Sequence, residues 1–176
     1  MKYYAPLLAI FGYAATSPVD MSLYKPETYV DAAFSPFVEE YYRTSEDKAA
    51  TSSFTNFWPA DGTLIAAGKP FKGSASILGV KQNLLPPDGN KAWWHLIQGA
   101  NVVSEDDRTK TINAKIIIQT TYTPGNCSQA HGNAAFTVAK GTDGVPNWTP
   151  HTGNLLVYNL TVNTIQTPTD EGCTKA

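Results

Sequence analysis

The spacing of apolar residues divides the chain into a helical front part and a strand-forming back part. Between residues 26 and 44, apolar side chains recur every three or four positions, which places them on one face of a helix. These side chains are Val30, Phe34, Phe37, Val38 and Tyr41. The dipeptide Ser35-Pro36 predicts either a kink in this helix or the start of a second one. Two further helices are expected, at residues 49–57 and 74–85.

From residue 91 onward the pattern is typical of an antiparallel sheet. We expect long strands at residues 92–103, 109–122, 128–140 and 148–162, after two short strands at 63–67 and 69–72. The connections between the long strands carry the Asp, Gly and Pro residues of tight turns. Helices in the first half of the chain and long strands in the second half, without alternation of the two, indicate the α+β class. We therefore expect a curved antiparallel sheet that forms a cone-shaped half barrel, covered by three N-terminal helices.

The first 17 residues have the layout of a secretory signal peptide. Lys2 precedes a short apolar run at residues 5–15, and small residues follow up to position 17. The alternative interpretation of this stretch is a first core helix. We expect a signal peptide at 1–17, one cone-barrel domain at 18–165 and a C-terminal tail at 166–176.

Composition and charge narrow the range of partners. The chain has 176 residues, of which 42% are hydrophobic, so it fits one domain with a sizeable core. Its formal net charge is −2 and no run of Lys and Arg occurs, which argues against a nucleic-acid partner and against binding to an anionic membrane. No apolar stretch reaches the roughly 20 residues that span a bilayer.

The two cysteines, Cys127 and Cys173, belong to neither a CxxC motif nor a Cys/His cluster, so no metal site is expected. In an oxidising compartment they would pair and tether the tail, with a stabilisation of roughly 4 kcal/mol from loop closure. The alternative is two free thiols in a cytosolic protein. Three N-glycosylation sequons, at Asn126, Asn147 and Asn159, favour export, so we expect a secreted glycoprotein.

Asn159 raises a question of strand orientation. A glycosylated Asn159 must face solvent, and strict alternation would then point Tyr158 to the covered face. Leu155 and Val157 would share the exposed face with the glycan. Either that face is packed, and a homodimer through the outer sheet face is one way to pack it, or Asn159 carries no sugar.

Two motifs resemble a known superfamily. Residues 54–64 read FTNFWPADGTL, and Phe71-Lys72-Gly73 precedes the third expected helix. Together with the order of elements over residues 34–162, they resemble the nuclear transport factor 2-like, or SnoaL-like, cone fold. That superfamily includes cyclases, dehydratases, isomerases and non-enzymatic binding proteins, so the resemblance implies a fold more than a function.

Within the superfamily, the segments KAWWHLIQG (91–99), VSED (103–106) and QTTY (119–122) resemble the scytalone dehydratases of fungal melanin synthesis. The resemblance implies a fungal protein and elimination of water from a hydroxylated polyketide, by two histidines assisted by tyrosines and an aspartate. His95 matches the first histidine, whereas Gln119 occupies the position of the second. The tyrosine–aspartate pair falls around Tyr41, Tyr42 and Arg43, without the carboxylate.

The candidate pocket consists of one histidine with aromatic and amide neighbours. Its expected members are Tyr41, Tyr42, Trp58, Trp93, His95, Gln119 and Tyr158. His95 is either a general base or a hydrogen-bonded core histidine. The aromatic residues either line a cavity or fill the core.

The expected positions of Gln119 and Trp148 need separate comment. Gln119 is in phase with Ile117, whereas Ile116 and Ile118 lie on the other face, so the strand needs a bulge or a partner subunit to cover both sets. Trp148, inside a sequon and next to prolines, is expected at the periphery.

Gln119 and the missing carboxylate favour a secreted protein that binds a hydrophobic small molecule or interacts with a host, without catalysis. The alternative is an acid/base lyase or isomerase that acts on a polyketide- or terpene-like substrate through His95. A third possibility is a structural domain with a filled core. No phosphate-binding loop, GxSxG or HExxH motif occurs, and no cofactor is expected.

Overall fold

The computed structural model describes residues 19–166 and 171–175. The signal-peptide prediction therefore lies outside the described residues, as does part of the predicted tail. The described residues form one seven-stranded sheet in the order β1-β4-β5-β6-β7-β2-β3. Its strands are β1 (Lys25–Pro26), β2 (Thr63–Ala66), β3 (Lys69–Lys72), β4 (Ala92–Glu105), β5 (Thr109–Thr123), β6 (Asn126–Ala139) and β7 (Leu155–Gln166). The helices are α1 (Phe34–Glu46), α2 (Ser52–Thr55) and α3 (Ser74–Leu84).

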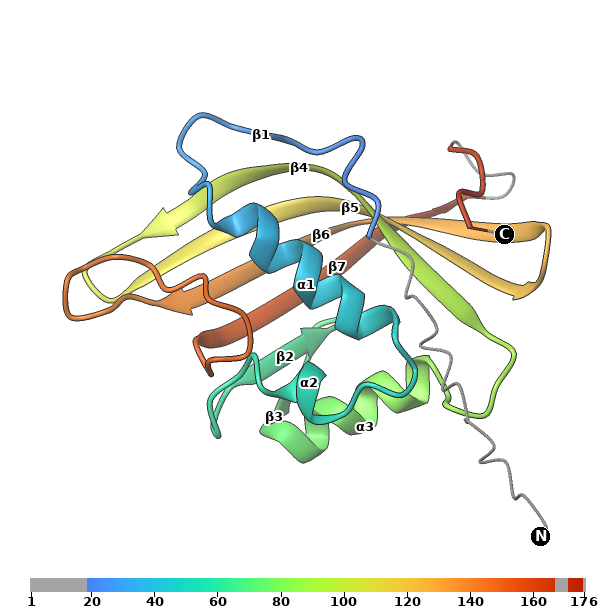
Figure 1. Cartoon of the computed structure of the whole chain (residues 1–176), viewed down its shortest axis with the longest axis horizontal. Helices are drawn as coiled ribbons and strands as arrows, with labels where there is room; N and C mark the ends of the chain where they lie inside the picture. The colour runs from blue at the N-terminus through green and yellow to red at the C-terminus, as the bar shows by residue number, and fades with distance from the viewer. Residues whose placement is uncertain (1–18, 167–170, 176) are drawn as a thin grey trace, which may run out of the picture.

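The expected α+β fold is confirmed. Strands β4 to β7 form a long antiparallel meander that curves around α1, while α2 and α3 lie at the β2–β3 end (Figure 1). Two pairings differ from the expected antiparallel sheet, because β1 runs parallel to β4 and β2 runs parallel to β7. We call the helix-covered side of the sheet the inner face and the opposite side the outer face.

Helix α1 begins at Phe34 and not at residue 26 as its apolar spacing predicts. Pro26 instead lies in β1 opposite Ala100, and the backbone N–H of Glu27 donates to the Ala100 carbonyl. Pro36 sits in the first turn of α1, where a helix has no use for the missing N–H. The dipeptide Ser35-Pro36 therefore lies at the start of a helix and not at a kink, but this helix is the first of the described residues and Ala33, not Ser35, is at its N-cap.

The residues before β7 form a loop and not the expected strand, which begins at Leu155 instead of position 148. Positive φ angles at His151 (61°) and Gly153 (71°) take the backbone out of the extended conformation. Trp148 is not peripheral, because its ring packs edge-on against Phe34 and Phe37 at 5.0 and 5.3 Å. The prolines and the sequon were the reason to expect Trp148 at the periphery, but the indole anchors this loop in the core.

A β-bulge resolves the orientation of β7. Val138 pairs with Leu155, whereas the preceding Thr137 pairs with Val157, so β7 carries one extra residue between the two pairs. The bulge lets both Leu155 and Tyr158 be buried in the core, while Asn159 is exposed. Leu155 is thus covered without a second subunit, and the homodimer stays a prediction.

Candidate active site

A small cavity lies between the helices and the inner face of the sheet. Its volume is about 60 Å3 and its lining is mostly apolar. Four residues of the predicted pocket line it, namely Tyr41, Trp93, His95 and Tyr158. Helix α3 contributes Val80, Lys81 and Leu84 to the wall, and β5 and β7 contribute Ile118 and Leu160.

Three other predicted members do not line this cavity. Tyr42 is buried beside it, and its hydroxyl lies 3.3 Å from that of Tyr158. Trp58 packs behind Tyr41, with ring centroids 5.7 Å apart. The prediction that Gln119 belongs to the pocket is wrong. The alternation of β5 places Gln119 with Ile117 on the outer face, away from the helices.

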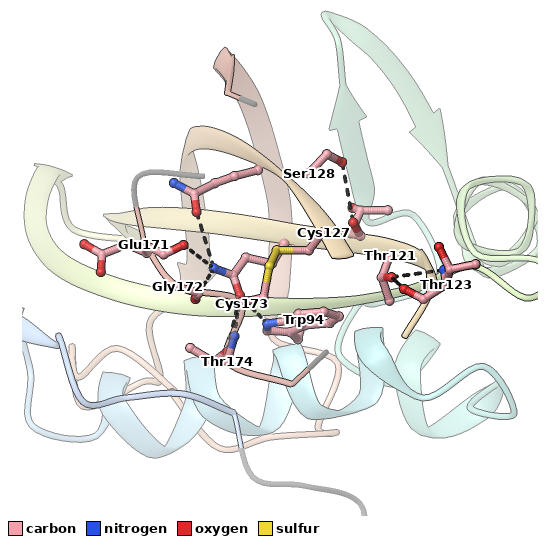
Figure 2. The surroundings of a disulfide bond; sticks show 12 residues. Trp94, Thr121, Thr123, Cys127, Ser128, Glu171, Gly172, Cys173 and Thr174 are labelled. Carbon is pink, nitrogen blue, oxygen red and sulfur yellow. Dashed lines mark hydrogen bonds between the residues drawn. A yellow bond between two sulfur atoms is a disulfide. The ribbon is translucent and has the colours of Figure 1, made fainter. Parts of the chain in front are cut away.

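The chain itself covers that part of the outer face. Trp94, Leu96, Ile117 and Cys127 form a separate apolar cluster there, and Leu23 packs against it. The predicted disulfide between Cys127 and Cys173 is confirmed, and it brings the C-terminal residues to the same cluster (Figure 2). The two sets of isoleucines on β5 are therefore both covered within one chain.

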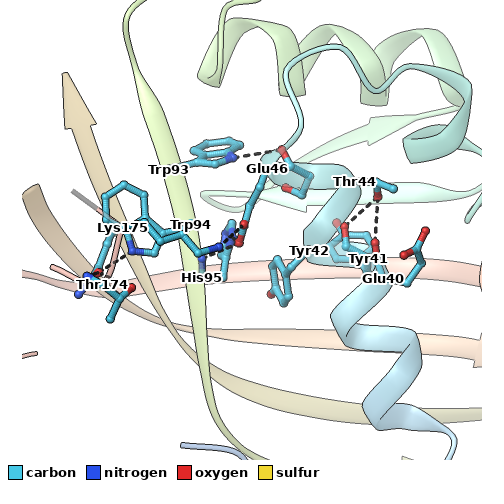
Figure 3. Close-up of polar contacts among 12 residues, drawn as sticks. Glu40, Tyr41, Tyr42, Thr44, Glu46, Trp93, Trp94, His95, Thr174 and Lys175 are labelled. Carbon is cyan, nitrogen blue, oxygen red and sulfur yellow. Dashed lines mark hydrogen bonds and ion pairs between the residues drawn. The ribbon is translucent and has the colours of Figure 1, made fainter. Parts of the chain in front are cut away.

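The central feature of the site is a carboxylate that holds His95. Glu46, the last residue of α1, places Oε1 3.2 Å from His95 Nδ1 and 2.7 Å from the His95 backbone nitrogen (Figure 3). Because the backbone N–H and the ring Nδ1–H both donate to one oxygen, the ring is fixed in orientation and tautomer. Among the described residues nothing hydrogen-bonds to Nε2, so this nitrogen is the one left with a free lone pair.

Sequence reasoning missed Glu46. The resemblance placed the expected carboxylate next to Tyr42, where Arg43 stands, and the acid is found one helical turn further on. The spacing of four residues between Tyr42 and Glu46 was the available signal, since residues i and i+4 lie on the same helix face. The Tyr42 ring indeed stacks on His95 with centroids 4.2 Å apart.

The tyrosines of the site remain neutral hydroxyl donors. Burial raises the pKa of Tyr158 to about 12 and raises the pKa of Tyr41 and of Tyr42 well above the ordinary value. Desolvation is the main cause for all three, because an ionised phenol loses its water shell in this apolar surrounding. Near neutral pH these groups can donate hydrogen bonds to a ligand but do not carry charge.

Lys81 is the cation in the cavity wall. Its ammonium donates to the carbonyl oxygens of Asp47 and Ala50, at 2.6 and 3.0 Å, and burial lowers its pKa. It thereby ties α3 to the segment after α1. Among the described residues no group of His, Cys, Asp and Glu could hold a metal ion, and no helix there is long and apolar enough to cross a membrane.

Comparison with solved structures shows the fold. ActVI-ORFA from Streptomyces coelicolor matches with a TM-score of 0.60 at 12% identity, over 75% of this chain and 96% of that one. A scytalone dehydratase-like protein from Novosphingobium aromaticivorans matches at 0.56 and 12%, over 76% and 84%. Nuclear transport factor 2 from Cryptosporidium parvum matches at 0.54 and 11%, over 74% and 92%. The chain has the nuclear transport factor 2-like, or SnoaL-like, cone fold.

The cone fold that the resemblance over residues 34–162 implied is therefore confirmed. Neither the family models nor the curated proteins compared with the sequence give a match. Neighbours with this fold include a dehydratase-like protein and a transport factor, so the fold does not select an activity. The arrangement of His95, Glu46 and the tyrosines in this chain has to carry the functional argument.

Proposed function

We propose that the cone-fold domain is an acid/base lyase or isomerase that abstracts a proton from carbon, with His95 as the general base. The observation that carries the proposal is the contact between Glu46 and His95, because an imidazole oriented by a carboxylate is a competent base near neutral pH. The absence of a carboxylate was one of two reasons to favour a binding protein, and Glu46 removes it. The other reason, Gln119, concerns a residue outside the cavity.

In the proposed reaction, His95 Nε2 accepts a proton from a carbon next to a carbonyl group. The electron pair of the broken C–H bond moves toward that carbonyl, and its oxygen accepts a hydrogen bond from Tyr158 as negative charge develops. In a lyase, the electron pair then expels a hydroxyl group from the β-carbon, which takes the proton from the imidazolium and leaves as water. In an isomerase, the imidazolium returns the proton to a different carbon.

The cavity supports a small and mostly apolar substrate. A volume of about 60 Å3 is about twice the roughly 30 Å3 that one water molecule takes in the liquid, so a ring-sized substrate requires the wall to open. Only two side chains of helix α3, Ile77 and Lys81, are buried, and Leu84 at the cavity is 43% exposed. A polyketide- or terpene-like substrate would therefore enter by displacing α3, and the dehydratase name of one structural neighbour supports elimination of water as the first reaction to test.

A binding protein without catalysis is the second candidate. It is favoured by the hydrogen bonds of the other polar groups at the site, since Tyr42 and Tyr158 contact each other and Lys81 is held by backbone carbonyls. On this alternative the cavity retains a hydrophobic small molecule unchanged, whether for transport or for interaction with a host.

One experiment distinguishes the proposed enzyme from the binding protein. Purified protein is incubated with a panel of β-hydroxy ketones in D2O, and water loss and deuterium incorporation are followed by NMR and mass spectrometry. A general base contributes about 10²- to 10⁴-fold, so His95→Gln is expected to lose at least that factor. His151→Gln, which lies outside the cavity, is the matched control. Equal conversion by wild type and His95→Gln would reject His95 as the base. No conversion of any substrate, together with a ligand that co-purifies and is recovered unaltered, would favour the binding protein.

Secretion is part of the same proposal. It is supported by the disulfide, which is typical of oxidising compartments, and by the exposure of Asn126 and Asn159 within their sequons. Asn147 is half-buried, and its side-chain oxygen accepts from the backbone N–H of Thr149. Intact-mass analysis of protein from the native source, with and without glycosidase, tests the glycans and the removal of residues 1–17. An unglycosylated chain that retains Met1 would contradict secretion by this route.

A further inference from the structure

The C-terminal residues 171–175 are attached to the outer face by covalent and polar contacts. Cys173 is bonded to Cys127 at the start of β6 (Figure 2). On either side of Cys173, the carbonyl of Gly172 accepts from Gln119 Nε2 at 2.9 Å, and the backbone N–H of Thr174 donates to Gln119 Oε1 at 3.1 Å. We call residues 171–175 the tail.

The side chain of Gln119 is built to hold this tail. It is fully buried, and Oε1 also accepts from Trp94 Nε1 at 2.6 Å, while Nε2 lies 3.3 Å from Gln129 Oε1. Both ends of the amide are thereby used, which fixes its orientation. A buried amide satisfied in this way by tail backbone sets the register of the tail on the sheet.

With the tail in this register, Lys175 lies beside Glu46, the carboxylate that contacts His95. Its Nζ lies 3.3 Å from Glu46 Oε2, while Oε1 of the same carboxylate contacts His95 (Figure 3). Only about a tenth of the Glu46 side chain and about a fifth of the Lys175 side chain are exposed, so this pair is partly shielded from solvent. The carboxylate that orients His95 is thus held from behind by a residue whose position depends on the disulfide.

We propose that Lys175 is a positioning residue for the Glu46–His95 pair, and that the Cys127–Cys173 disulfide keeps it in place. The consequence for catalysis rests on the proposed function, whereas the effect on His95 itself does not. Reduction of the disulfide to two thiols by a dithiol reductant, which is oxidised in exchange, would release the tail and remove the lysine from Glu46.

Geometry decides what the loss of Lys175 changes. Lys175 holds Oε2 of Glu46, while Oε1 of the same carboxylate accepts from the His95 backbone N–H and contacts ring Nδ1. Two neighbouring cations are already engaged, since Arg43 is paired with Glu40 and Lys81 is held by backbone carbonyls. Without Lys175 the carboxylate is free to turn, and the His95 ring loses the contact that orients it.

The test is the NMR signal of the His95 ring at one fixed pH, assigned with His95→Gln, because this readout does not need a substrate. Lys175→Met is expected to shift and broaden the ring signals, because the carboxylate that orients the ring is no longer held by the tail. Lys175→Arg should restore the wild-type signals, and Lys72→Met, at an exposed lysine of β3, should leave them unchanged. Lys175→Met signals that coincide with those of wild type would overturn the proposal.

The redox part is tested in the same way. Wild-type protein treated with dithiothreitol, and the variant Cys127→Ser/Cys173→Ser, should both give the His95 signals of Lys175→Met. A reduced protein with the His95 signals of the oxidised one would show that the disulfide does not control Lys175. Lys175→Met keeps the disulfide, so a folding failure of the cysteine variant does not remove the test. If the shift is present but wild type converts no substrate, the proposed function fails while the positioning of His95 by the tail stands.

Discussion

The two faces of the sheet are covered by different kinds of interaction. On the inner face, α1 and the strands share one continuous aromatic cluster, in which the Phe136 ring lies 5.0 to 5.5 Å from those of Phe34, Tyr41 and Tyr158. On the outer face, the apolar cluster around Trp94 is small, and a disulfide and one amide side chain hold the covering tail. Elsewhere this face is polar, with hydrogen-bonded asparagines and threonines across β4, β5 and β6.

Strand β4 contributes side chains to both faces. Along β4, Trp93 and His95 face the cavity, whereas Trp94 lies in the outer cluster. The inner face is stabilised by apolar area, which is not directional and responds little to pH or redox state. The outer face depends on a few specific groups, so a single chemical change there can release the tail. Three variants test this contrast between the faces, and a fourth, at Glu40, measures a charge effect outside both.

The largest loss of stability is expected from Phe136→Ala. Phe136 is fully buried at the centre of the inner cluster, so the free energy of unfolding should fall by about 3–5 kcal/mol. Urea unfolding followed by tryptophan fluorescence measures the loss. Phe136→Leu should lose clearly less, and Tyr29→Ala, at a side chain that is 83% exposed, should stay within about 0.5 kcal/mol. A loss below about 1 kcal/mol for Phe136→Ala would mean that the inner cluster does not stabilise the fold cooperatively.

Removal of the disulfide should cost less and act locally. The cysteines are 46 residues apart, and Cys127→Ser/Cys173→Ser is expected to lower the free energy of unfolding by about 2–4 kcal/mol. Hydrogen exchange should increase in the tail and around Trp94 first, while the amides of α1 and β6 that surround Phe136 keep their relative protection. Uniform loss of protection across both faces would contradict their independence.

The sequence contained most of the fold because local patterns decide it. Helical spacing identified the apolar face of α1, and turn residues located the connections between the long strands. The errors lie where tertiary contacts override local preference, as at Pro26, which pairs with β4, and at Trp148, whose ring enters the core from a loop. A bulge such as the one in β7 is set by the partner strand and leaves little trace in the strand's own sequence.

The site was predictable only in part. His95 and three of its aromatic neighbours line the cavity as expected, because strand alternation and the family resemblance point to them. Glu46 and Lys175 were not found, since their contacts join positions 49 and 129 residues apart. Gln119 was assigned to the wrong face for the same reason, as its partners are in a tail more than 50 residues further along the chain.

A smaller effect on stability is expected at Gln119. Gln119→Leu keeps the volume but leaves the buried Trp94 indole N–H and the Gly172 carbonyl without partners, at a cost of about 1–3 kcal/mol. Asn113→Leu is the matched control, because this amide lies on the same face of β5 but is half-buried, and it should cost under about 1 kcal/mol. Denaturant unfolding measures both, and the rate of disulfide reduction should rise for Gln119→Leu alone. Equal behaviour of the two variants would show that Gln119 does not hold the tail.

The smallest effect concerns Glu40, a half-buried residue of α1 that contacts the loop before β7. Hydrogen bonds from Arg43, at 2.5 Å, and a contact with His151, at 2.7 Å, lower the pKa of the Glu40 carboxyl. Because the folded state binds this proton less tightly than the unfolded chain, the pairing stabilises above the ordinary value of 4.5, and the gain disappears as the pH falls through the lowered pKa. Glu40→Gln should therefore lose under about 1 kcal/mol near neutral pH and nothing in strong acid, whereas Glu39→Gln should be neutral throughout. Thermal unfolding of both variants across this pH range measures the difference, and a loss at Glu40 that persists in strong acid would mean that side-chain packing, and not charge, stabilises this part of α1.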